Sequence, residues 1–422
     1  MNRRAFLGSL AGGLLAAALV GGGTHPTISA APAAISRDGV NDGAPYQIEI
    51  PTNWNRGLVM FAHGYQGEGS GAGDLQGSPL SHYLAAHGYA WAASGYRGRG
   101  YRPDWFLADT LALRERVIRE FGRPRWTIIH GQSMGGHVAI ASLELHPEIY
   151  QGGLIECGIV DGVGLIDWLY AYTAAAEYLS GVRILDAPDR PTFMTLVNGS
   201  WLNAMGMPGS YTDRGRRFDS VVKYLSGGEL PLRGKGMSHR YLMNLNSRDP
   251  GPDRAREFAR HASTVHVRYR IDPGLGFDEE TLNREVRRIT PAAGARSRAT
   301  NPVFAELTGQ IRVPLLTIHE TADFRVPFRL EQDYRQRTIA AGTAHLLVQR
   351  AVRWAGHCAF DGVARERAFA DLVTWVERGI RPPGDDVLAG DPAKLGLRWT
   401  PALDPEDPEA GRCGGSQCKA TD

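Results

Sequence analysis

The chain has 422 residues, of which 43% are hydrophobic and 22% are charged, and its formal net charge is +2. A chain of this length and composition can bury a large core. The near-neutral charge, with no basic stripe and no acidic tail, argues against a nucleic-acid partner and favours a small-molecule partner.

The first 33 residues predict an export signal. The pair Arg3-Arg4 precedes an apolar stretch rich in Gly and Ala over 8–20, and small residues follow near residue 30. This pattern resembles a bacterial twin-arginine signal. A membrane anchor is the alternative, but the apolar stretch is shorter than the ~20 residues that a span needs. We therefore expect a secreted or periplasmic protein with no integral membrane association after the signal is removed.

Beyond the signal, short runs rich in Val, Ile and Leu alternate with helical patterns. The predicted strands are 46–50, 57–62, 89–94, 126–130, 153–159, 313–319 and 345–351. The predicted helices are 80–87, 105–120, 136–145 and 364–378. Such alternation predicts an α/β fold with a mostly parallel sheet flanked by helices.

The alternation is interrupted between residues 161 and 312, where aromatic, Gly, Pro and Arg residues dominate. We expect this segment to be a large cap inserted into a core formed by 44–160 and 313–382. Residues 383–422 are rich in Pro, Gly and Asp, which predicts a C-terminal surface tail.

Residues 131–135 read Gly-Gln-Ser-Met-Gly and lie between a predicted strand and a predicted helix. A serine on a sharp strand-to-helix turn needs glycine on both sides, because the backbone is strained and neighbouring strands approach closely. The pattern also occurs by chance in glycine-rich turns. Its position between strand and helix favours Ser133 as a nucleophile.

A serine hydroxyl is a weak nucleophile, and it needs a base that is itself oriented by a carboxylate. Asp323 lies in the loop after the predicted strand 313–319, and His357 lies in the loop after 345–351. Glu320, three residues before Asp323, is the alternative acid. The chain order Ser133, Asp323, His357 is the one expected of an α/β hydrolase.

Four motifs together carry a resemblance to a known group of proteins. They are His63-Gly64 after an early strand, GQSMG at 131–135, TADFRVP at 321–327 and AGHC at 355–358. With these motifs the chain resembles serine hydrolases of the α/β-hydrolase fold over about 46–380, outside the cap. The GHC segment is similar to secreted esterases of the feruloyl-esterase and tannase type, and SMGG to prolyl-oligopeptidase-like hydrolases.

The resemblance implies a function and further site residues. It implies that the backbone N–H groups of Met134 and Tyr65 hold the oxyanion, with Gln66 as second choice for the latter. Gln66 and the cap aromatics Trp168 and Tyr172 are candidate substrate-binding residues, although the two aromatics would also serve to pack the cap.

The expected function is hydrolysis of a carboxylic ester of a small molecule through a Ser-His-Asp triad and an acyl-enzyme. The alternatives are a peptidase or amidase of the prolyl-oligopeptidase-like type, an acyltransferase, and a non-catalytic binding protein. No metal or organic cofactor is implied. Zinc is a poor alternative, since neither a CxxC nor an HExxH spacing occurs.

The four cysteines would be exported to a compartment in which disulfides persist. Cys413 and Cys418 flank a short Gly-rich loop and are predicted to close a small ring. Cys157 and Cys358 then remain, either as a disulfide that braces the histidine loop or as two buried thiols.

Overall fold

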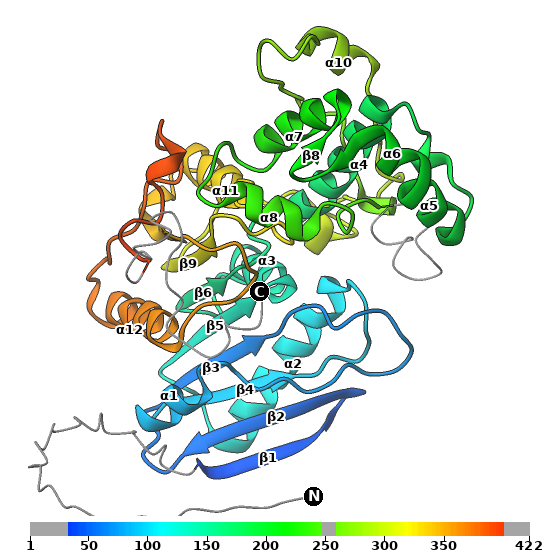
Figure 1. The fold of residues 1–422 in the computed structure, drawn as a ribbon. Helices are drawn as coiled ribbons and strands as arrows, with labels where there is room; N and C mark the ends of the chain where they lie inside the picture. The colour runs from blue at the N-terminus through cyan, green and yellow to red at the C-terminus, as the bar shows by residue number, and fades with distance from the viewer. Residues whose placement is uncertain (1–32, 247–258, 401–422) are drawn as a thin grey trace, which may run out of the picture.

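A computed structural model describes residues 33–246 and 259–400 and contains an eight-stranded sheet with the order β1-β2-β4-β3-β5-β6-β9-β10 (Figure 1). The strands are β1 (Ala33–Asn41), β2 (Ala44–Pro51), β3 (Gly57–Ala62), β4 (Ala90–Ser94), β5 (Trp126–Gln132), β6 (Gly152–Glu156), β9 (Leu315–Glu320) and β10 (Leu347–Val352). β2 pairs antiparallel with β1 and β4, and the other pairs are parallel.

Helices cover both faces of this sheet, which is why its central strands are apolar runs without alternation. In β3, Leu58 and Met60 join a core cluster with α2 (Pro103–Phe121) and α3 (Met134–Leu145). Val59 and Phe61 point to the opposite face and pack with α1 (Ser81–Ala86) and α12 (Gly362–Arg378). The predicted mostly parallel sheet with flanking helices is confirmed.

The first strand was not predicted. β1 pairs with β2 across a turn at Asp42 and Gly43, where both residues have positive φ. Its side chains are largely exposed, so it lacks the apolar run on which the other strands were recognised. The Asp-Gly pair is a typical hairpin turn and was the one local signal for this strand.

The segment between β6 and β9 forms the inserted cap, which lies above one end of the sheet in Figure 1. Its helices are α4 (Gly164–Ser180), α5 (Arg190–Leu196), α6 (Leu202–Met205), α7 (Asp213–Leu225), α8 (Arg233–Arg240) and α10 (Glu279–Glu285), with a small hairpin of β7 (Gly206–Met207) and β8 (Ser210–Tyr211). Single-turn helices are η1 (Ile184–Asp186), η2 (Val197–Trp201) and η3 (Pro302–Phe304) in the cap, and η4 (Ala344–Leu346) and η5 (Pro392–Lys394) after it. Trp201, Phe218 and Tyr241 are buried against one another and give the cap a core of its own.

After the cap, α11 (Arg329–Ala340) and α12 complete the core. α12 begins after Asp361, whose carboxylate accepts the Ala364 N–H at 2.6 Å, and it ends at Gly379 in the left-handed conformation. Part of the predicted surface tail is packed against the core. The Ala351 N–H of β10 donates to Asp385 at 2.8 Å, and the Leu395 side chain is buried.

Residues 1–32, with most of the predicted signal, and 401–422, with Cys413 and Cys418, lie outside the described residues. Within the described part, no helix is both long and apolar enough to span a membrane.

Candidate active site

Ser133 occupies the sharp turn between β5 and α3. Its backbone has φ 55° and ψ −120°, a region that non-glycine residues seldom adopt. The flanking glycines are required by close packing, because a Cβ on Gly135 would lie 1.8 Å from the carbonyl oxygen of Ala62 in β3. On Gly131 it would lie 2.3 Å from the Gly135 carbonyl oxygen. The turn therefore projects the Ser133 hydroxyl from the carboxyl end of the sheet.

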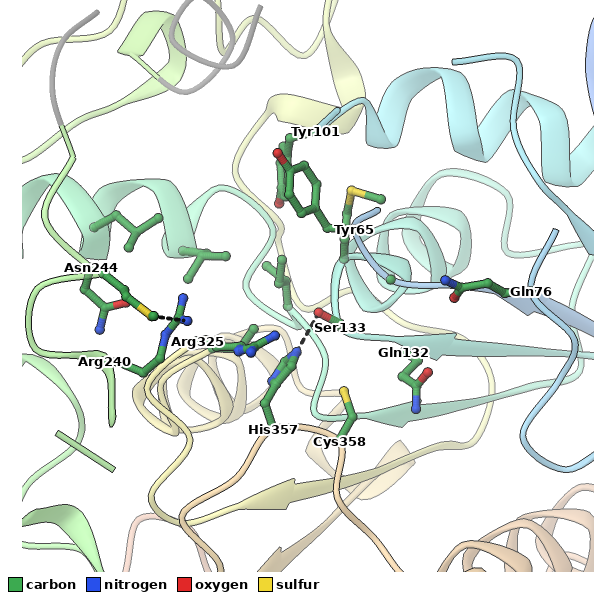
Figure 2. Close-up of a pocket in the computed structure, with 17 residues that line it drawn as sticks. Tyr65, Gln76, Tyr101, Gln132, Ser133, Arg240, Asn244, Arg325, His357 and Cys358 are labelled. Carbon is green, nitrogen blue, oxygen red and sulfur yellow. Dashed lines mark hydrogen bonds between the residues drawn. The ribbon is translucent and has the colours of Figure 1, made fainter. Parts of the chain in front are cut away.

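Three residues distant in sequence form a hydrogen-bonded relay at this turn. The Ser133 Oγ lies 2.8 Å from His357 Nε2, a contact that Figure 2 shows as a dashed line. His357 Nδ1 lies 2.5 Å from Asp323 Oδ2. With Nδ1 donating its proton to the carboxylate, Nε2 is free to accept the serine proton. The structure thus brings together the three residues singled out from the sequence.

The Asp323 carboxylate is held in place by its own loop. Its Oδ1 accepts the backbone N–H groups of Arg325 at 2.8 Å and Val326 at 3.1 Å. These bonds leave Oδ2 directed at His357, and Asp323 is only 2% exposed. Glu320, the alternative acid, instead accepts the Ala359 N–H at 2.7 Å.

A buried histidine lies behind the acid. His319 Nε2 donates to the Val326 carbonyl at 2.8 Å, and its Nδ1 lies 3.3 Å from Glu331 Oε1. Burial acts to lower the pKa of His319, but the carboxylates of Glu331, Asp323 and Glu320 outweigh it and raise this pKa to about 9. A protonated His319 therefore stands 3.8 Å from Asp323 Oδ2.

Glu320 allows a prediction about stability and pH. Burial, reinforced by the Asp323 charge and opposed by His319, raises the pKa of Glu320 from 4.5 to about 8. A carboxyl with a raised folded-state pKa contributes stability that is present below its unfolded pKa and lost as pH rises toward its folded pKa. We expect Glu320→Gln to gain at least about 1 kcal/mol relative to wild type between about pH 4.5 and pH 8. Urea unfolding at several pH values measures the free energy of unfolding of both proteins. If this free energy changed with pH in the same way in both proteins, the prediction would be contradicted.

Ser133 and His357 open into a cavity of about 430 Å³, a size typical of small-molecule sites. Ile159, Leu165 and Leu169 form an apolar wall, the last two from cap helix α4. The polar lining side chains are Tyr65, Gln76, Tyr101, Gln132, Arg240, Asn244 and Arg325. An adjoining hollow of about 690 Å³ shares Arg240, Met243, Arg325, His357 and Cys358 with this cavity.

The predicted cap residues do not line the cavity. Trp168 and Tyr172 are 5% and 0% exposed, and the Tyr172 hydroxyl donates to the Tyr241 carbonyl at 2.8 Å inside the cap. The residues of this helix that line the cavity are Leu165 and Leu169. Trp168 and Tyr172 are four residues apart as well, so apolar i, i+4 spacing alone could not tell the two faces of this helix apart.

The two predicted oxyanion donors lie at the cavity. As the first residue of α3, Met134 has an N–H without a partner inside the helix. Tyr65 is 37% exposed at the opening, and a Cβ on Gly64 would lie 3.1 Å from Ser133 Cβ, so this loop closely approaches the nucleophile. Gln66 lies outside the described lining residues, since its side chain binds the backbone of Asp74 at 2.6 and 2.8 Å.

A disulfide joins Cys157, just after β6, to Cys358, the residue following His357. The structure thus decides between the two alternatives left by the sequence. Cys157, His357 and Cys358 form a group whose ligand atoms lie within 4.8 Å of one another. The two sulfurs are joined in the disulfide, and thiolate is the form of cysteine that binds metal, so we infer no metal site there.

The strand order, the antiparallel second strand and the serine turn between β5 and α3 define an α/β-hydrolase fold. No protein-family profile matches the sequence, and no curated protein matches it.

Solved structures similar to this chain include esterases and a peptidase. Feruloyl esterase B from Aspergillus oryzae has 12% identity and a TM-score of 0.49, over 81% of this chain and 80% of that chain. The acylaminoacyl peptidase of Pyrococcus horikoshii has 16% identity and a TM-score of 0.40, over 84% of this chain but only 43% of that chain. Est1E from Butyrivibrio proteoclasticus has 11% identity and a TM-score of 0.39, over 79% of this chain and 95% of that chain. At these identities and TM-scores the matches carry no argument about activity.

Proposed function

We propose that the protein is a serine hydrolase that cleaves carboxylic esters. The observation that carries the proposal is the relay from Ser133 through His357 to Asp323 at the cavity floor. Ser133 Oγ attacks the ester carbonyl while His357 Nε2 takes its proton, and the Met134 and Tyr65 N–H groups stabilise the oxyanion. The alcohol leaves with the proton from His357, and water then releases the acid by the same steps.

The charges around the cavity do not favour a peptidase that recognises a free substrate amine. A peptidase that recognises a free substrate amine needs a carboxylate near the nucleophile. The described residues lining the cavity include Arg240 and Arg325 but no Asp or Glu. An acyltransferase would share the relay and differ only in the acceptor of the acyl group.

We also propose that the protein is exported. The Arg3-Arg4 pair with its apolar stretch supports a twin-arginine route. The disulfide between Cys157 and Cys358 is compatible with an oxidising compartment outside the cytoplasm.

A fluorophosphonate probe tests the reaction class. We expect it to label the wild-type protein on the peptide containing Ser133 and to leave Ser133→Ala unlabelled, because only an activated serine reacts. A panel of aliphatic esters, aryl esters and amino-acid amides, assayed in parallel, should show turnover of esters. Labelling at another residue would overturn the assignment of Ser133. Faster turnover of the amides would favour the peptidase, and no reaction with any probe would favour a non-catalytic binding protein.

A further inference from the structure

Two arginines line the candidate active-site cavity on the side where the cap meets the acid loop. Arg325 from the loop after β9 and Arg240 from α8 both line the cavity and the adjoining hollow. In Figure 2 the Arg325 side chain extends toward Ser133 and His357, with Arg240 and Asn244 beyond it. No Asp or Glu is among the described residues that line the cavity, whereas Asp323 is among those that line the adjoining hollow.

Arg325 is held by its backbone while its guanidinium is left for a ligand. Its N–H donates to Asp323 at 2.8 Å, so its main chain is fixed by the carboxylate that orients His357. Within the described residues, its guanidinium makes no hydrogen bond or ion pair. Nearby Arg329, by contrast, pairs with Asp333 at 2.6 Å, and Arg233 pairs with Asp219 at 2.9 Å.

Arg325 is an exposed residue, and its guanidinium is matched best by a planar anion that accepts two parallel hydrogen bonds. Arg240 adds a second positive charge beside Met243, whose sulfur lies 2.9 Å from its Nη1. The apolar lining residues Leu165 and Leu169 suit a hydrocarbon segment. Together these features fit a ligand with an apolar body and a carboxylate.

We propose that the natural substrate is an ester that also carries a carboxylate, and that Arg325 binds this group. The inference rests on the proposed ester hydrolysis and deepens it by naming the substrate class. Arg325 is a specificity-determining residue in this view, and Arg240 strengthens the local field.

Two matched substrate pairs test the proposal. The first pair is 4-acetoxybenzoate, whose carboxylate lies on the alcohol side of the acetyl ester, and its neutral methyl ester. The second pair is mono-p-nitrophenyl adipate, whose carboxylate lies on the acyl side, and its neutral methyl ester. For at least one pair, we expect Arg325→Gln to lower the ratio of anionic to neutral kcat/KM by about tenfold or more. Arg325→Lys should lower this ratio less, because lysine keeps the positive charge but cannot donate two parallel hydrogen bonds to a carboxylate.

Arg329→Gln is the matched control, since it removes the same charge four residues away, outside the described lining of the cavity. It should leave the ratio unchanged. The substrate pair whose ratio falls in Arg325→Gln shows whether the carboxylate lies on the alcohol side or the acyl side of the cleaved ester. An unchanged ratio for both pairs, or an equal fall in Arg329→Gln, would overturn the proposal.

The failure of the proposed function would look different. In that case neither the anionic nor the neutral esters would be cleaved, and the fluorophosphonate probe would not react at Ser133. Calorimetric titration of adipate into wild type and Arg325→Gln would then test the anion site alone. Weaker binding of adipate to the variant would support an anion site at Arg325, and equal binding to both proteins would rule out this site.

Discussion

Asp323→Asn is expected to lower kcat on p-nitrophenyl acetate by about 10⁴-fold, with a much smaller effect on KM. The carboxylate accepts the His357 Nδ1 proton at 2.5 Å and two backbone N–H groups on its other oxygen. An amide in that position can turn its NH₂ toward Nδ1 and stabilise the tautomer that carries the proton on Nε2. That tautomer cannot accept the serine proton.

Glu320→Gln is the control for this assignment. Glu320 is a buried carboxyl three residues away, and the Gln side chain can still accept the Ala359 N–H through its amide oxygen. Its loss of activity should be far smaller than that of Asp323→Asn. If the two variants lost activity equally, or if Glu320→Gln lost more, Asp323 would not be the orienting acid. Circular dichroism of each variant would show whether it had folded.

Removing the disulfide as Cys157→Ala/Cys358→Ala is expected to cost about 2–5 kcal/mol of unfolding free energy. The crosslink joins positions that are 201 residues apart, so it restricts the unfolded chain strongly. Cys358 directly follows His357, and loss of the crosslink should allow the base to move away from Ser133. We expect kcat to fall by roughly tenfold to a hundredfold, since small misplacements of a catalytic group are costly.

Urea unfolding and steady-state kinetics measure the two effects. Wild-type protein treated with a reductant is a second route to the same state and should behave like the double variant. A variant as stable as wild type would contradict the structural role of the crosslink. A variant that is less stable but retains full kcat would show that the histidine loop is held by its other contacts.

The sequence predicted the core well because each chemical group follows a buried strand. Ser133, Asp323 and His357 follow three strands that lie close in one parallel sheet, and the carboxyl ends of such strands share an edge. The predicted turn chemistry at Ser133 was equally local, since it depends on glycines next to the serine.

The cap residues that line the cavity could not be predicted in this way. Arg240 and Arg325 are 85 positions apart and meet only because α8 packs over the acid loop, which no local pattern encodes. For a similar reason, the sequence did not show which face of α4 lines the cavity. Its residues are mostly buried, so hydrophobicity alone does not tell a cavity wall from a packed core. Part of the tail packs against β10 through single residues such as Leu395, and its Pro and Gly content obscured this.

The two faces of α4 have a consequence for how the specificity of this protein can change. Leu165 and Leu169 line the cavity, while Trp168 and Tyr172, on the neighbouring face, hold the cap together. Substitutions at the two leucines would reshape the space offered to a substrate without removing aromatic packing or any group of the relay. Natural drift or a laboratory library confined to that one helical stripe could therefore broaden or narrow the substrate range while fold and chemistry stay constant.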